Sequence, residues 1–499
     1  MKSQLNLSMS LPLNPSRMVL SALAAAMLMA GCSSAPTLRA PKIDVPGAFK
    51  EANNVVKAAD GTLWQRATPA EAQPRGQWWL VFQDASLNQL IDDASGANAS
   101  LAVAAARVRQ ARAIAGIANA ERMPQMGLAV GAERLRVSPV SLGEAQNAHV
   151  APGGGYQASL SASYEVDLFG RVSSNVSAAQ ADAGAQEATY RSVLLSLQAD
   201  VAQTYFRLRE TDAELATLNQ TVALREQSVH VNQRRYDLGD LGEFDLARAK
   251  TELSTARAEA IALQLQRVKN EHALAVLLGK PAASFTAGVN PMSESGSLPQ
   301  IPSGMPSALL ERRPDIAAAE QAMVASNARI GVARAAMFPV LTLGAGLGGQ
   351  SASIADLLAW NSRTWLLGAM LSLPIIDGGR NKANIARSEA VLEESVATYR
   401  QSVLLAFAEA EDNLAGLRIL AGETEQINDA VLSSRRALEL AQKLYAAGRS
   451  SYLDLLDAQR NLASIERSAV QLRGNRAVTT VALIRALGGG WDSAAPVSK

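Results

Sequence analysis

The chain has 499 residues, with 47 basic and 46 acidic side chains, and its formal net charge of +1 gives no bulk electrostatic case for nucleic acid as a partner. Its single cysteine, Cys32, excludes an intramolecular disulfide, and the three histidines are too widely spaced to favour a His/Cys metal site. Aromatic residues make up only 4%, while alanine supplies much of the apolar 48%, a composition that suits closely packed helices and points away from an enzyme.

The amino-terminal segment has the pattern of a bacterial lipoprotein signal. Lys2 and Arg17 precede an uncharged stretch, residues 18–30, which is too short to span a bilayer. Small residues then lead into Cys32, as in a lipobox, and Ser33 favours sorting to the outer membrane. We therefore expect residues 1–31 to be a signal peptide, Cys32 to carry a covalent lipid, and no other cofactor to be present. An ordinary signal peptide with an incidental cysteine is the alternative.

An internal duplication organises the rest of the chain. Residues 163–279 correspond to residues 372–488 at a constant separation of 209, as Gly170-Arg171 does to Gly379-Arg380. We predict an extended segment after the lipid anchor and two tandem repeats, as expected for an ancient duplication. The predicted segments are the anchor with its extended segment at 32–83, the first repeat at 84–279, a linker at 280–306, the second repeat at 307–488 and a tail at 489–499.

Each repeat is predicted to contain a helix, two strands, a very long helix and a return helix. The helical apolar spacing extends over about 65 residues in the long segments, and a helix of that length would span about 100 Å. Proline ends the helix that precedes the strands in each repeat. The predicted helices run from Leu87 to about Arg122, Arg171 to about Tyr236, about Asp245 to Leu278, Ser307 to about Met337, Arg380 to about Tyr445, and Leu453 to about Leu487.

Between these helices the apolar period changes to two. We predict strands at about 125–137, 155–169, 339–350 and 363–376, the length of tilted transmembrane strands, with glycine and serine on the inward face. A soluble antiparallel sheet with one wet face would show the same alternation. Four strands cannot close a barrel in lipid, and a polar conduit favours three or more chains.

Several motifs, taken in order along this duplicated frame, resemble the TolC-like outer-membrane factors, specifically the lipoprotein branch of drug and metal efflux systems. They are Trp78-Trp79 through Asp84, Asp167 through Arg171, Arg312 through Asp315, Asp377 through Arg380, and Ser451 through Arg460. The resemblance implies a mainly α fold with membrane β: a homotrimeric, twelve-stranded transmembrane β-barrel with four strands per chain, continued by a long periplasmic helical barrel.

The same resemblance implies a function and its partners. The chain is expected to be no enzyme but a passive, gated exit duct, lipid-anchored in the outer membrane and docked to a periplasmic adaptor protein and an inner-membrane pump. It would export small molecules such as drugs or metal ions. A duct for type I protein secretion and a periplasmic coiled-coil lipoprotein without a pore are the alternatives; the lipobox favours small-molecule efflux.

The turns between the long and return helices carry the candidate gate. Gly239 and Gly448 stand where a helix ends in a left-handed residue. Asp245 and Asp454 stand at the start of the return helices, where capping is the simpler interpretation of both.

The resemblance assigns the constriction of the gate to Leu453, Asp454 and Asp457, and Arg248 is the counterpart of Asp457 in the first repeat. It also implies a link between helices that holds the tips shut. Tyr445 and Asp245 match that link, whereas its arginine falls at Ser450, beside Arg449.

Overall fold

The computed structural model describes residues 36–38, 46, 49–51, 77–143, 145, 149, 151–293, 298–299 and 312–489. The predictions for the signal peptide, for Cys32, for most of residues 32–83, for much of the linker and for nearly all of the tail lie outside these residues. The chain divides into two units, which are described separately: Met1–Pro41 with Arg109–Gly184 and Glu320–Ala397, and Lys42–Val108 with Ala185–Ala319 and Thr398–Lys499.

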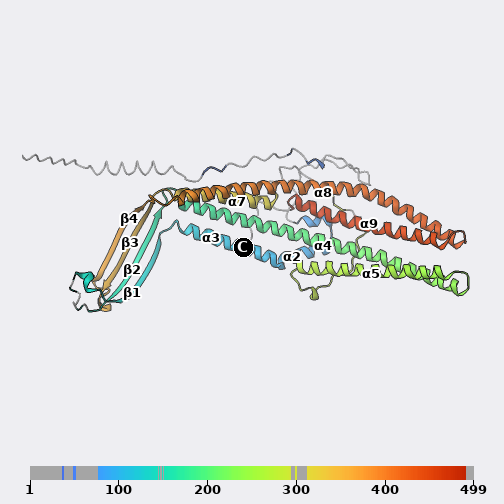
Figure 1. Cartoon of the computed structure of the whole chain (residues 1–499), viewed down its shortest axis with the longest axis horizontal. Coiled ribbons are helices and arrows are strands. Elements are labelled where there is room, and N and C mark those ends of the chain that lie inside the picture. Colours follow the sequence, from blue (N-terminus) through green and yellow to red (C-terminus); the bar gives the residue numbers. More distant parts are fainter. Residues whose placement is uncertain are drawn as a thin grey trace, which may run out of the picture. The chain divides into compact units, whose positions relative to one another are not determined.

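The first unit contains an antiparallel sheet of four strands in the order β1-β2-β3-β4 (Figure 1). The strands are β1 (Gln125–Leu135), β2 (Gly153–Val166), β3 (Val340–Ser351) and β4 (Arg363–Ser372). Their register aligns Leu128, Leu160, Leu347 and Trp365 in one row, and Gly127, Ser161, Gly346 and Leu366 in the neighbouring row. Since successive side chains point to opposite faces, one face is apolar and the other is rich in glycine and serine, as predicted.

Two long helices among the described residues begin in this unit, each a few residues after a strand. The carboxylate of Asp167 accepts hydrogen bonds from the amides of Val172 and Ser173 at 3.0 and 2.7 Å, at the start of α4 (Arg171–Asp237). Asp377 does the same for Gly379 and Asn381 at 2.9 Å, at the start of α8 (Arg380–Ala446). Two of the family-like motifs thus supply acceptors for the otherwise unpaired amides of a helix start.

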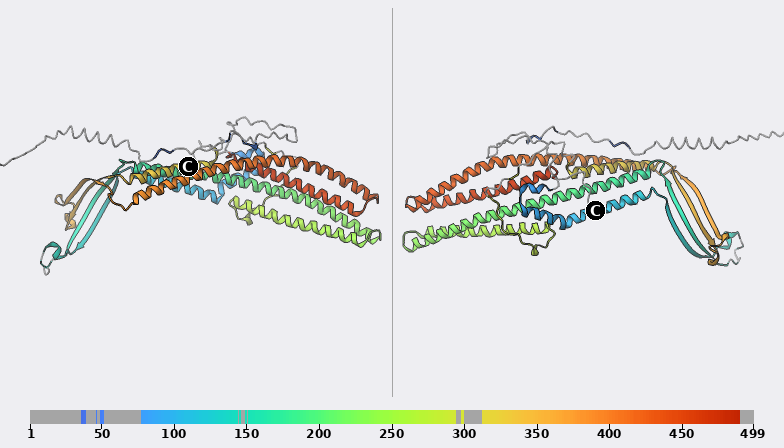
Figure 2. Two further views of the ribbon diagram at one scale, coloured as in Figure 1. Left: turned by 45° about the horizontal axis from the view of Figure 1, so that its top comes forward. Right: turned by 180° about the vertical axis from the view of Figure 1, so that it is seen from behind.

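The second unit is helical and preserves the duplication. It holds the greater part of α4 and α8, both of 67 residues, with the return helices α5 (Glu243–Leu277) and α9 (Tyr452–Ala486), both of 35 residues. Figure 2 shows α5 running beside α4 and α9 beside α8. The equal lengths confirm the predicted repeat. No helix in the described ranges is both long enough and apolar enough to cross a membrane.

The single helix predicted from Leu87 to Arg122 is wrong, because the chain breaks at Asn98 into α2 (Ala85–Ala97) and α3 (Ala99–Ala120). Asn98 has an extended backbone, with ψ of 126°. Its side-chain oxygen accepts from the Leu101 amide at 3.1 Å and its side-chain nitrogen donates to the Leu277 carbonyl at 2.9 Å. Asn98 therefore caps α3 and ties it to the end of α5. The matching helix of the second repeat is α7 (Pro314–Ala335).

A short amino-terminal stretch packs on the second repeat. Phe49 is 1% exposed and belongs to a core with Leu414 on α8 and Leu483 on α9. The amides of Lys50 and Glu51 donate to the carboxylate of Glu411 at 2.7 and 3.0 Å. Phe49, the Glu411 carboxylate and the ion pair of Glu51 with Arg418 at 2.6 Å thus hold this stretch against helices that lie more than 350 residues later in the chain.

Candidate functional site: the helix-hairpin tips

Both hairpin tips end their long helix with the same backbone motif. Gly239 and Gly448 have φ of 81° and 68°, confirming the predicted left-handed residues. The Asp240 amide donates to the Arg235 carbonyl at 2.8 Å, and the Arg449 amide donates to the Leu444 carbonyl at 2.9 Å. This bond from the residue after the left-handed glycine back into the last turn of the helix is the Schellman motif, in which glycine avoids the steric cost of the left-handed conformation.

The two return helices begin differently. Ser451 caps α9, since its hydroxyl accepts from the Asp454 amide at 3.2 Å while the Asp454 carboxylate accepts from the Ser451 amide at 2.9 Å. These bonds form a capping box, and they lower the pKa of the exposed Asp454 below its ordinary value, chiefly through the Ser451 hydroxyl. The first return helix starts at Gly242 without a side-chain cap, and Asp245 is half-buried in its first turn.

The three predicted constriction residues share the exposed side of α9. Leu453 is 40% exposed, and the side chain of Asp457 is 58% exposed. The neighbouring side chains Tyr452, Leu455 and Leu456 are buried. Asp457 lies 4.0 Å from the guanidinium of Arg460, at the limit of an ion pair. The second-repeat tip therefore presents two carboxylates and a leucine to its surroundings.

The predicted link residues do not all meet. The Tyr445 hydroxyl accepts a hydrogen bond from Arg235 on α4 at 2.8 Å, and the same guanidinium lies 5.6 Å from the centre of the Tyr445 ring. Within the described residues, Asp245 and Arg449 make no side-chain hydrogen bond or ion pair, and the buried Ser450 hydroxyl has no partner. Tyr445 thus connects the second hairpin to the first through Arg235, a residue that the sequence did not single out.

A buried carboxylate joins the two hairpins further from the tips. Glu252 on α5, whose side chain is 9% exposed, lies 2.9 Å from Arg225 on α4 and accepts from Nε of Arg460 on α9 at 3.0 Å. The hydrogen bonds from Arg460, followed by the charge of Arg225, hold the pKa of Glu252 below its ordinary value. Glu252 could have been found from the sequence, because it is a charged residue within the row of leucine and alanine that α5 buries.

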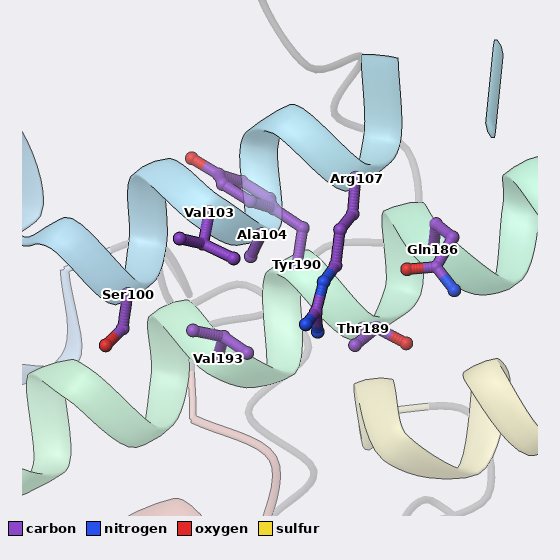
Figure 3. Close-up of a pocket in the computed structure, with 8 residues that line it drawn as sticks. All are labelled: Ser100, Val103, Ala104, Arg107, Gln186, Thr189, Tyr190 and Val193. Carbon is purple, nitrogen blue, oxygen red and sulfur yellow. The ribbon is translucent and has the colours of Figure 1, made fainter. Parts of the chain in front are cut away.

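A separate hollow of about 250 Å³ lies between α3 and α4, at residues whose roles the sequence did not predict. Figure 3 shows Arg107 extending from α3 toward Thr189 on α4, with Val103 and Val193 on the facing sides. The lining holds hydroxyl groups and one cation, but no pair of nucleophile and base. Among the described residues, no cluster of His, Cys, Asp or Glu could hold a metal ion.

Comparison with known proteins places this geometry in context. The model of the family "Outer membrane efflux protein" matches residues 90–280 and 305–489, one match for each repeat. The outer membrane protein OprJ of Pseudomonas aeruginosa is 36% identical over 473 residues, covering 95% of this chain and 96% of OprJ. The toluene efflux pump outer membrane protein TtgF of Pseudomonas putida is 32% identical over 474 residues, covering 94% and 96%.

Solved structures agree over nearly the same length. A membrane protein from Pseudomonas aeruginosa superposes with a TM-score of 0.80 at 33% identity, covering 92% of this chain and 100% of that one. The open state of the MtrE outer membrane channel of Neisseria gonorrhoeae gives a TM-score of 0.78 at 28% identity, covering 92% and 98%.

Proposed function

This chain belongs to the outer membrane efflux protein family, and from that premise we propose that it is the gated exit duct of a tripartite pump, assembled as a homotrimer. It is an outer-membrane component of an efflux system, in a family of channel proteins. In the described sheet β1 and β4 each pair with one neighbour only. Three chains would join these edges into twelve strands, which supports the trimer.

The cargo is proposed to be small molecules, delivered by an inner-membrane pump through a periplasmic adaptor. Relatives of this chain are named for the export of toluene, antibiotics, solvents and pyoverdine, all small compounds, which favours this cargo over secreted proteins. The duct itself supplies no energy. A lipid on Cys32 would add to the attachment in the outer membrane, and the lipobox before that residue supports this part of the proposal.

The gate is proposed to lie at the second-repeat tips, and a single observation carries it: Leu453, Asp454 and Asp457 are exposed together at the start of α9. In a trimer, three such tips would surround one aperture with carboxylates and leucines. The leucines would narrow the aperture and resist leakage, and the ring of carboxylates would attract cations and repel anions. In the first repeat, Arg248 stands in place of Asp457, so the two tips are not equivalent.

Conductance across planar bilayers tests this assignment. Asp457→Asn removes one charge without touching the capping box, and the double variant with Asp454→Asn removes both. We expect larger single-channel conductance, weaker block by divalent cations and lower cation selectivity in each, with the greater effect in the double variant. Asp240→Asn, an exposed carboxylate on the first-repeat tip, is the matched control. If the double variant conducts like the wild type, these residues do not form the gate.

A further inference from the structure

The apolar face of the sheet carries charge at one end only. Among the strand positions in register with Leu128 and its row, the charged residues are Arg134 on β1 and Arg363 on β4, both beside the loops that join β1 to β2 and β3 to β4. Both are basic and exposed. The acidic residues of the strands, Glu133 and Glu165, occupy the opposite face. A charge on a lipid-facing surface is costly in the hydrocarbon and tolerated at the interface, so these arginines mark the interface.

Two tryptophans frame Arg363. Its guanidinium lies 3.8 Å from the centre of the Trp360 ring, which is 75% exposed and immediately precedes β4. Trp365, 79% exposed, is two positions further along the same face. Stacking on an aromatic ring fixes the plane of a guanidinium and leaves its N–H groups at the edge. Within the described residues the side chain of Arg363 makes no hydrogen bond or ion pair, so the guanidinium donors are unused.

The segment before Arg363 adds exposed apolar side chains at this end of the sheet. Ile354 and Leu358, in the segment between β3 and β4, are 68% and 87% exposed. The opposite ends of all four strands lead into helices, which would lie in the periplasm, where the proposed function places the adaptor that the duct meets. The loop end therefore faces outward, and the depth of Arg363 corresponds to the boundary between hydrocarbon and headgroups, where tryptophan also prefers to lie.

From this arrangement we propose that Arg363, oriented by Trp360 and flanked by Trp365, binds the phosphate of an outer-leaflet lipid headgroup. The planar guanidinium donates to phosphate oxygens in a bidentate fashion, while the indole rings and the loop side chains contact the acyl chains. Arg134 adds a second positive charge at the same end of the face. The inference rests on the outward orientation given by the proposed function, but not on the gate.

The test compares lipid binding to the purified full-length protein, by native mass spectrometry and by the shift in melting temperature. The probes are phosphorylated lipid A and the same lipid after removal of its phosphates. We expect the wild type to prefer the phosphorylated form. Arg363→Gln should lower that preference about tenfold, the value of one lost charge-assisted hydrogen bond, and Trp360→Leu, outside the strands, should lower it in the same direction. Arg109→Gln, an exposed position on α3, should leave it unchanged.

Two results would overturn the proposal. One is an equal preference for the phosphorylated lipid in the wild type, Arg363→Gln and Trp360→Leu. The other is displacement of the lipid by inorganic phosphate at equal concentration, since the site would then recognise free anions rather than a headgroup. Bilayer conductance of Arg363→Gln serves as the check on folding and keeps this test separate from that of the duct, because normal channels are expected from this variant.

Discussion

The buried Glu252 offers the sharpest test of how the two hairpins are held together. Glu252→Ala removes a carboxylate that is 9% exposed and leaves Arg225, 12% exposed, without a charge partner. Breaking a buried ion pair by removing one member costs 3–5 kcal/mol in general. Arg460 is 44% exposed and can turn toward water, so the lower end applies and we expect about 3 kcal/mol. That free energy corresponds to roughly a hundredfold rise in the equilibrium constant for local opening of the helices.

The assay is hydrogen–deuterium exchange of α5 and of the first turns of α9 in the assembled protein. Glu226→Ala is the matched control: Glu226 forms an ion pair with Arg257 across the same two helices, α4 and α5, but the side chains are 47% and 56% exposed. Such an exposed pair contributes about 1 kcal/mol or less, so exchange should rise by no more than a few-fold. Equal exchange in the two variants would refute the view that the buried carboxylate couples the hairpins.

Two further predictions concern other buried groups of the helical unit. Burial, with the charge of Glu214, raises the pKa of Glu210 to about 7. Because this folded-state pKa exceeds the unfolded one, the free energy of unfolding falls as pH rises toward 7. In melting temperatures measured as a function of pH, Glu210→Gln should flatten this decline. An unchanged dependence of melting temperature on pH in Glu210→Gln would contradict the raised pKa of Glu210. Phe49→Ala should release the stretch that it anchors, since loss of a buried phenylalanine costs about 3–5 kcal/mol, and trypsin should then cleave after Lys50 faster than in the wild type. Unchanged cleavage at Lys50 would show that Phe49 is not the anchor.

The regular architecture could be predicted from the sequence because its signals are local and are repeated. An apolar period of two or of three to four residues identifies a strand or a helix from its neighbours alone. The separation of 209 residues then required α8 and α9 to repeat α4 and α5, as they do. The left-handed Gly239 and Gly448 were predictable for the same reason, since few other residues can end a helix in this way.

What the sequence could not supply were partners brought together from distant segments. Asn98 looked like an ordinary helix position because the carbonyl that it binds lies 179 residues later in the chain. Phe49 looked like part of an extended tether because its core is made by helices of the second repeat. Tyr445 was assigned to a link with Asp245, yet its hydroxyl bonds to Arg235, on the other side of the first turn. The gate residues themselves remain predictions, supported by their exposure.

The two open edges of the sheet constrain how the protein can be made. Before assembly, the outer sides of β1 and β4 expose unpaired peptide groups. In water such edges invite pairing with any extended chain, and in lipid each unpaired peptide group costs several kcal/mol. A single protomer with these open edges is thus unfavourable both in water and in the lipid bilayer. For the proposed trimer, subunit association is therefore expected to be coupled to membrane insertion, and protomers made in excess should be shielded by chaperones or removed by proteases.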